Sequence, residues 1–221
     1  MNKIGRFSPL GNFVIAENGV FLEVGTPIFQ TRFMYHGELS LKQISRSRIE
    51  HSTLTTDFTW LAPPAPSGLL HQAIGYFRAV MAHGGAKQVR GEGGGLKEEG
   101  RHGDIPYWLH EKDHSELHQM EALVWMTYRK DEGWQIRVPP QSLTAARVNS
   151  VPITPHDNVA IVLHSHGRWH PIWSATDNSD ETDGFVYGVI GNLHTHRPTI
   201  SLRVGYANQF LRIRKSDVFA N

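Results

Sequence analysis

The sequence predicts an α/β protein in which a small β-rich N-terminal region precedes a mixed sheet with helices. Three observations lead to this prediction. Short apolar, β-branched runs recur along the chain, one apolar stripe has helical spacing, and a proline-rich segment separates the two parts. With 221 residues and 39% hydrophobic side chains, the chain suffices for one large domain or for an ordinary domain with an appendage.

The composition excludes several kinds of site and partner. Cysteine is absent, so disulfides and thiolate metal sites are excluded, and any metal must be held by histidine and carboxylate. The formal net charge of +1 favours neither nucleic acid nor an anionic membrane as a partner. No run of about 18 apolar residues predicts a transmembrane helix, and the first residues lack the apolar stretch of a secretory signal. We therefore expect a cytoplasmic protein.

Residues 1–62 are expected to form the β-rich N-terminal domain, whose role the sequence does not identify. Two apolar runs, residues 13–15 and residues 20–24, lie on either side of Glu17-Asn18-Gly19. Such a polar, glycine-ending turn between two apolar runs is typical of a β-hairpin.

The second domain, residues 63–221, is predicted to begin with a helix. Three prolines between residues 63 and 66 cannot lie within a helix or a central strand, and they mark the boundary. Ser67 is a candidate N-cap, and beyond it apolar residues recur at three- and four-residue steps. Gly84-Gly85 then predicts the end of the helix.

Further along the chain, composition separates an insertion from several strands. Residues 84–104 are rich in glycine and nearly devoid of apolar side chains, so we expect a flexible, exposed insertion there. Apolar runs predict strands at residues 133–138, 185–191, 200–204 and 210–213.

The most informative stretch is residues 159–177. Residues 159–163 form an uninterrupted apolar run, as expected of a strand buried on both faces. The run ends on His164 and His166, and residues i and i+2 of an extended segment point to the same face, so the two imidazoles can converge on one point. A third ligand from the loop beyond, Asp177, would leave a fourth position for water, which is the arrangement of a catalytic rather than a structural zinc.

The register of these side chains resembles the signature of the JAMM (JAB/MPN) metalloprotease family. His164-x-His166 is followed after seven residues by Ser174, and Asp177 follows after two more residues. The resemblance implies an MPN-type, cytidine-deaminase-like fold in which His164, His166 and Asp177 bind Zn²⁺. It also implies that Ser174 is a catalytic residue whose hydroxyl donates to the oxyanion of the tetrahedral intermediate.

The residues around Ser174, including Trp173 before it and the acidic residues after Asp177, look similar to the bacterial branch of this family called PRTRC system protein A. Family members cleave peptide or isopeptide bonds after the extended C-terminal tail of ubiquitin or a ubiquitin-like protein. The resemblance therefore implies a ubiquitin-like protein as substrate and an E1-like adenylating protein as a partner. The substrate rests on this analogy alone.

The mechanism also needs a carboxylate that accepts a proton from the activated water. In the family this glutamate lies on the strand preceding the His-x-His strand, and the resemblance assigns the role to Glu121, which opens the apolar run of residues 122–128. Glu111, Glu116 and Glu132 remain alternatives. A further alternative is that Glu121 is a surface charge at the end of a strand.

Two other histidine patterns compete with this site. His110-Glu111-x-x-His114 matches the zincin motif, although the segment has no apolar stripe and no third ligand at the zincin spacing. His194 and His196 repeat the His-x-His pattern without the serine and aspartate, and we expect them on a turn before a strand. The alternative functions are accordingly a noncatalytic MPN scaffold, a zincin-type endopeptidase, and metal-dependent hydrolysis of a small amide.

Five neighbours of the motif have two interpretations each. Asp180, Glu181 and Asp183 either orient the ligands or form a solvated acidic loop. Trp169 and Trp173 either wall a substrate channel or pack against the domain.

Overall fold

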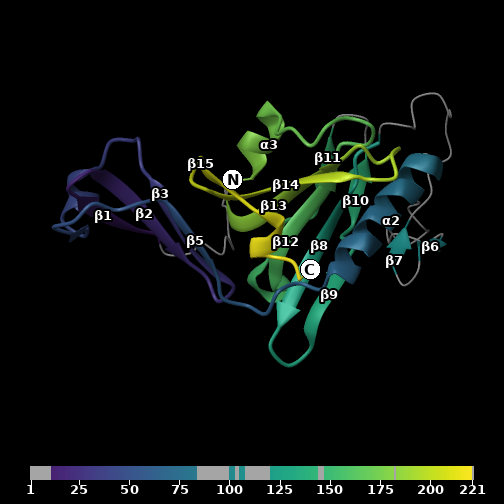
Figure 1. Ribbon diagram of the computed structural model, residues 1–221, viewed down its shortest axis with the longest axis horizontal. Coiled ribbons are helices and arrows are strands. Elements are labelled where there is room, and N and C mark those ends of the chain that lie inside the picture. Colours follow the sequence, from purple (N-terminus) through teal and green to yellow (C-terminus); the bar gives the residue numbers. More distant parts are fainter. Residues whose placement is uncertain are drawn as a thin grey trace.

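The computed structural model describes residues 11–83, 100–102, 105–107, 120–143, 147–181 and 183–220. Its architecture is α/β, with a five-stranded N-terminal sheet beside a six-stranded central sheet (Figure 1). The central sheet contains both parallel and antiparallel pairs, so the predicted α/β class with a mixed sheet is confirmed.

The N-terminal sheet has the strand order β4-β1-β2-β3-β5. Its elements are β1 (Gly11–Ala16), β2 (Gly19–Gly25), β3 (Phe29–Met34), the short helix α1 (Leu41–Ile44), β4 (Arg48–Ile49) and β5 (Asp57–Trp60). Strands β1 and β2 form the predicted hairpin, with Ala16 paired to Gly19 across Glu17 and Asn18. Gly19 has a φ of +143°, which side chains rarely allow and which glycine supplies without strain.

The central sheet has the order β15-β14-β13-β12-β8-β9. Its strands are β8 (Leu123–Arg129), β9 (Gly133–Arg137), β12 (Val159–Ser165), β13 (Asp183–Gly191), β14 (Thr199–Tyr206) and β15 (Gln209–Ile213). Strand β12 runs antiparallel to β8 and parallel to β13, and the crossover from β12 to β13 includes helix α3 (Ala175–Asp180). All seven residues of β12 are buried, which confirms the predicted fully buried strand.

Strand β12 contributes residues to two different packing clusters. Ile161 and Leu163 belong to the main core, whereas Val162 packs with Trp125 and Tyr187 in a smaller cluster on the other face. Because side chains alternate along a strand, His164 lies on the face of Val162. This is the face opposite the main core.

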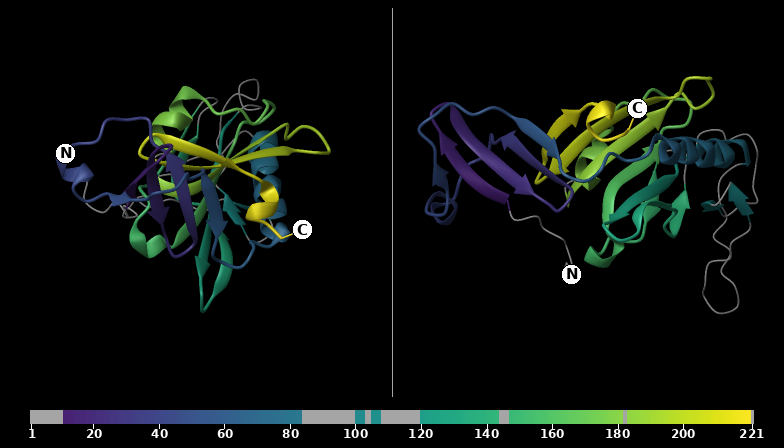
Figure 2. Two further views of the ribbon diagram at one scale, coloured as in Figure 1. Left: turned by 60° about the vertical axis from the view of Figure 1, so that its left-hand side comes forward. Right: turned by 60° about the horizontal axis from the view of Figure 1, so that its bottom comes forward.

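Helix α2 (Ser67–His83) confirms the predicted amphipathic helix. It packs on the central sheet through side chains of the main core, namely Leu70, Ala73, Tyr76, Phe77 and Val80. The same continuous core includes residues of the N-terminal sheet, namely Leu22, Val24, Phe29 and Phe33. Figure 2 shows the N-terminal sheet extending from one end of the central sheet, with α2 toward the other end. The two parts of the chain therefore share buried apolar contacts.

The remaining elements are short. They are β6 (Gly100–His102), β7 (Ile105–Tyr107), β10 (Gln141–Leu143), β11 (Val148–Ser150) and the 3-10 helices η2 (Pro155–Asp157) and η3 (Lys215–Asp217). Most of the predicted glycine-rich insertion lies outside the described residues, but its residues 100–102 form β6 and pair with β7, which the composition did not predict. None of the helices in the described part of the chain has the length and apolar character needed to span a membrane.

Candidate metal centre

Three side chains converge beside the end of β12. The Nε2 atom of His164 lies 3.1 Å from Nε2 of His166 and 3.3 Å from Oδ1 of Asp177, and Nε2 of His166 lies 3.6 Å from Oδ2 of Asp177. The three side chains are only 6%, 11% and 12% exposed. One donor atom from each lies within 4.8 Å of the other two, so this group can hold a metal ion.

The donor separations test whether an ion fits between the three residues. A tetrahedral ion with ligand bonds of 2.0–2.1 Å has ligands about 3.3 Å apart. The separation of 3.1 Å between the two imidazole nitrogens is close to this value, and each nitrogen lies 3.3 or 3.6 Å from one of the two carboxylate oxygens of Asp177. Two imidazole nitrogens and one carboxylate oxygen also form a donor set that transition metals accept, whereas calcium and magnesium prefer oxygen ligands. The residues present therefore fit a small tetrahedral metal ion.

The extended backbone around His164 and His166 explains why their rings converge. Strand β12 ends at Ser165, but the backbone pairing continues, because the N–H of His166 donates to the carbonyl of Ile190 at 2.9 Å. A turn follows at once, in which the N–H of Trp169 donates to the carbonyl of His166. The backbone thus stays extended through both histidines and turns away immediately after the second.

Asp177 reaches the histidines from the first turn of α3. Ser174 is the N-cap of this helix, and its Oγ accepts a hydrogen bond from the N–H of Asp177 at 3.1 Å. In return, Oδ2 of Asp177 accepts from the N–H of Ser174 at 2.6 Å. Ser174 is exposed, and its hydroxyl hydrogen stays available for donation because the oxygen acts as the acceptor in the cap. The structure thus brings Ser174 to the edge of the cluster.

Glu121 lies two residues before the start of β8 and faces His166. Ser165 holds this segment, since its N–H donates to the carbonyl of Ala122 and its Oγ accepts from the N–H of Ala122. The Oε1 atom of Glu121 lies 3.9 Å from Nε2 of His166. Burial raises the pKa of Glu121 to about 7, with a further rise from Asp177 and an opposing effect from His166. A carboxyl group with such a pKa is suited to accept and release a proton near neutral pH.

Of the other candidate carboxylates, Glu132 is the one that the described residues include. Glu132 lies in the turn between β8 and β9, where it pairs with Arg129 at 2.8 Å. Glu111 and Glu116 lie outside the described residues, as do His110 and His114 of the competing zincin motif.

The pKa shifts of His164 and Asp177 favour metal binding at neutral pH, whereas that of His166 opposes it. Burial lowers the pKa of His164, which keeps this ring neutral, as a ligand must be. Burial also acts to lower the pKa of His166, but Asp177 and Glu121 raise it overall. For Asp177, burial acts to raise the pKa, but hydrogen bonds to the two histidines hold it well below the usual range. Asp177 is therefore ionised.

Glu181 contacts His164, and Arg203 contacts Glu181. The sequence left two interpretations of Glu181 open and did not identify Arg203. Oε1 of Glu181 lies 3.4 Å from Nδ1 of His164, and Oε2 of Glu181 lies 2.8 Å from the Arg203 guanidinium. Glu181 is buried, so the alternative of a solvated position is wrong for this residue. Asp180 is exposed and pairs with Arg147 at 3.4 Å, as expected of a solvated position. Asp183 begins β13.

The two tryptophans of the motif have different environments. Trp173 packs in the smaller apolar cluster, with the Arg203 guanidinium 3.8 Å above its ring centre. Trp169 is 63% exposed, and Ile172 on the same loop is 69% exposed. The packing interpretation therefore holds for Trp173, whereas Trp169 lies on the surface of the loop that follows His166.

The second His-x-His pair has the predicted position. His194 and His196 are exposed and lie in the turn between β13 and β14. Arg78 of α2 holds this turn through the carbonyls of Leu193 and Thr195.

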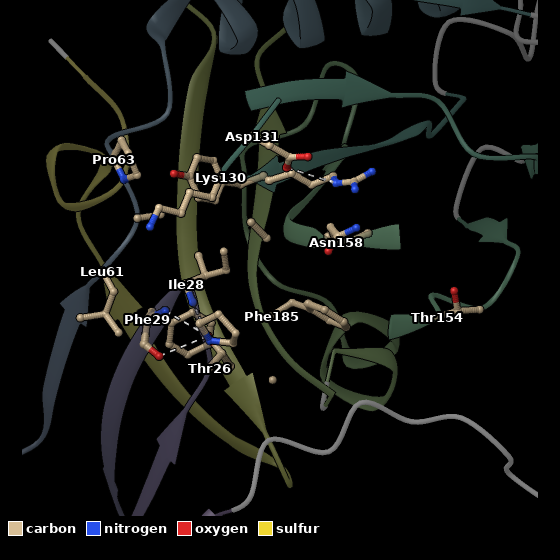
Figure 3. A pocket seen from close by; sticks show the side chains of 17 residues that line it. Thr26, Ile28, Phe29, Leu61, Pro63, Lys130, Asp131, Thr154, Asn158 and Phe185 are labelled. Atoms are coloured by element: carbon tan, nitrogen blue, oxygen red, sulfur yellow. Dashed lines mark hydrogen bonds and ion pairs between the residues drawn. The ribbon is translucent and has the colours of Figure 1, made fainter. Parts of the chain in front are cut away.

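A cavity of about 630 Å³ lies at the other end of β12 (Figure 3). Ile28, Phe29 and Leu61 line one side of it and Phe185 another. Val159 lies in its lining, and the five residue steps from there to His164 span about 17 Å of strand. The cavity is therefore separate from the donor cluster.

Comparison of the chain with protein-family models and with curated proteins gives no match. The resemblance to the JAMM family therefore rests on the motif and stays a prediction.

Proposed function

We propose that the chain is a JAMM-type zinc metallopeptidase that cleaves a peptide or isopeptide bond after the C-terminal tail of a ubiquitin-like protein. The main support is the convergence of His164, His166 and Asp177 at separations that fit a tetrahedral ion. Glu121, 3.9 Å from His166, adds the carboxylate that the reaction needs. A structural site has four protein ligands, whereas three donors with an adjacent carboxylate are typical of a catalytic one.

The donor set favours zinc among the transition metals, because neutral imidazoles and one carboxylate are common ligands of catalytic zinc. When bound, zinc supplies Lewis acidity, which lowers the pKa of water to about 7 and polarises a carbonyl. Glu121 accepts the proton of the attacking water and transfers it to the leaving amine. The Ser174 hydroxyl donates a hydrogen bond to the oxygen on which negative charge develops.

The proposed substrate class follows from the family resemblance, and two exposed side chains support a protein substrate. Trp169 and Ile172 project from the loop between His166 and Ser174. Large exposed apolar side chains next to a reactive site are typical of surfaces that bind proteins. This feature favours a protein tail over the small amide. The E1-like adenylating partner is proposed from the resemblance alone.

The first experiment measures zinc per chain by elemental analysis. It compares the unmodified protein with Asp177→Asn and with the double variant His164→Ala, His166→Ala. The double variant His194→Ala, His196→Ala is the matched control, because it removes an exposed His-x-His pair. We expect about one zinc per chain, lost in both site variants and retained in the control.

Zinc retained in both site variants would place the metal elsewhere, with His110 and His114 as the next candidates. No zinc in any variant after reconstitution would favour the noncatalytic scaffold. If zinc is bound as expected, cleavage of a ubiquitin-like protein fused through its tail to a reporter tests the activity. Glu121→Gln is expected to abolish cleavage and to retain zinc, whereas equal cleavage by this variant would refute the assignment of the base.

A further inference from the structure

We propose that Arg203, on a strand that contributes none of the three metal donors, is a positioning residue of the metal centre and acts on His164 through Glu181. This inference rests on the proposed metal site. It adds two residues to the site that the JAMM-like motif does not include.

The contact between Glu181 and His164 follows from the chemistry of imidazole. A neutral histidine that binds a metal through Nε2 carries its proton on Nδ1. Nε2 of His164 faces His166 and Asp177, whereas Nδ1 lies 3.4 Å from Oε1 of Glu181. Oε1 of Glu181 is therefore the carboxylate oxygen on the Nδ1 side of the ring, where it favours the tautomer and the ring orientation that bind metal.

Glu181 needs a cation, because a buried carboxylate without one is costly. Arg203 supplies it through two nitrogens, with Nε at 2.9 Å and a terminal nitrogen at 2.8 Å from the same oxygen, Oε2. Both contacts use Oε2, so Oε1 is left for His164. Arg203 is itself only 3% exposed, and the pair is thus shielded from solvent.

The guanidinium of Arg203 is fixed from several directions. It lies between two aromatic rings, 3.8 Å from the ring centre of Trp173 and 4.0 Å from that of Phe210. Its third nitrogen donates to Oδ1 of Asn178 on α3 at 2.6 Å. Planar stacking combined with a fork of donors is a geometry that arginine provides and lysine does not.

The same contacts hold the helix that carries Asp177. Helix α3 buries none of its own residues, yet its last turn is tied to β14 through Asn178 and Glu181. The backbone also approaches closely, because a Cβ at Gly205 of β14 would overlap the carbonyl oxygen of Glu181. Arg203 therefore acts on two of the three donors, His164 through Glu181 and Asp177 through the position of α3.

The test is a double-mutant cycle read out as metal affinity. The unmodified protein, Glu181→Gln, Arg203→Met and the double variant are titrated with Zn²⁺ against a chromophoric chelator, and the Co²⁺ forms are compared by visible absorption. Each single change is expected to weaken Zn²⁺ binding by about 10- to 100-fold and to alter the Co²⁺ spectrum. Because Arg203 acts through Glu181, the double variant should bind about as weakly as the weaker single variant.

Arg212→Met is the matched control, since Arg212 is the cross-strand partner of Arg203 on β15 and is exposed. It should bind Zn²⁺ like the unmodified protein. Arg203→Lys, which keeps the charge without the fork, should recover only part of the affinity.

Unchanged affinity in Glu181→Gln, or fully additive losses in the double variant, would overturn the inference. If Arg203→Met does not fold, the nearly isosteric Glu181→Gln decides the question alone, with thermal unfolding of the metal-free protein showing that it is folded. Absence of metal binding in the unmodified protein would instead refute the proposed site, and the inference with it.

Discussion

Ser174 and Asp177 cap each other at the start of α3. The N–H of Ser174 donates to Oδ2 of Asp177 at 2.6 Å, and the N–H of Asp177 donates to Oγ of Ser174 at 3.1 Å. This reciprocal arrangement recurs where a serine and an acidic residue three positions later begin a helix. The Ser-x-x-Asp half of the motif therefore has a structural explanation of its own. Its chemical meaning comes from its position beside His164 and His166.

The two roles of Ser174 can be separated by substitution. Ser174→Ala removes the cap, which should cost about 1 kcal/mol of stability. It also removes the proposed donor to the oxyanion, which should lower kcat by about 100-fold. Zinc content should stay near that of the unmodified protein, because Asp177 keeps its contacts with both histidines. Steady-state kinetics, zinc analysis and urea unfolding measure these effects.

Ser174→Thr is the control, since threonine keeps the hydroxyl and caps helices nearly as well. It should retain most of the activity. Loss of zinc in parallel with activity in Ser174→Ala would show that Ser174 only holds Asp177 in place, and the oxyanion role would then be wrong.

Glu121 should give the reaction an acidic limb in its pH profile. Its pKa is raised to about 7 by burial, and it accepts a proton only in the ionised form. A bound cation lowers the pKa of a neighbouring carboxyl group, so we expect kcat/KM to rise with pH through a value at or below about 7. Kinetics between about pH 5 and pH 9 would show this rise.

Two variants identify the group responsible. Glu121→Gln should remove the activity at every pH, and Glu132→Gln, in the turn between β8 and β9, should keep the profile of the unmodified protein. A profile that is flat across neutral and mildly acidic pH would contradict the assignment of Glu121 as the base.

The sequence predicted the donor cluster because local rules determine most of it. Strand alternation places His164 and His166 on one face. Asp177 was expected in the loop beyond the strand, whereas the structure places it in the first turn of α3, which Ser174 caps. The buried strand at residues 159–163 and the helix after the prolines were also predicted from patterns within their own segments. Glu121 came from the family resemblance, since its segment meets the histidines only through the pairing of β8 with β12.

The parts that were not predicted depend on contacts between distant segments. Arg203 comes from β14, with β13 between it and the histidine strand, so no spacing in the sequence relates it to His164. Asp180 and Glu181 are adjacent and chemically alike, yet only Glu181 turns into the interior. The core shared with Leu22 and Phe29 likewise depends on how two sheets pack. Contacts between such distant segments cannot be predicted from the local periodicity of the sequence.

Zinc binding should weaken on acidification, and His166 should set the pH at which this occurs. Protons compete with metal for a histidine ligand. Burial acts to lower the pKa of His166, but Asp177 and Glu121 raise it overall, whereas the pKa of His164 is lowered. Affinity should therefore be full at pH values above the pKa of His166 and should fall as the pH drops through it. Chelator competition at a series of pH values measures this dependence.

Glu121→Gln tests whether the Glu121 carboxylate raises the pKa of His166. This change removes one of the two carboxylates that raise the pKa of His166, so the loss of zinc should move to lower pH. An unchanged midpoint in this variant would show that Glu121 does not interact with His166 as the 3.9 Å separation indicates.

The loop between the two halves of the motif should depend on Gly191 in β13. A Cβ at this position would overlap the carbonyl oxygen of Trp169 and lie 2.7 Å from the backbone nitrogen of Pro171. Backbone atoms cannot rotate away as side chains do, so the loop must shift in Gly191→Ala. We expect a loss of about 1–3 kcal/mol of stability. Zinc affinity should fall as well, because the loop connects His166 to Ser174.

Gly25→Ala is the matched control at the end of β2, where an added Cβ would meet only a side-chain carbon of Gln30 at 4.0 Å. Urea unfolding and chelator competition on both variants separate a local effect from the general effect of adding a methyl group. The loop between His166 and Ser174 contacts β13 at Gly191, and we expect this contact to fix the position of Ser174 relative to His166. Gly191→Ala with unchanged stability and unchanged zinc affinity would mean that the loop adapts freely, and the register of the motif would then be maintained by β12 and α3 alone.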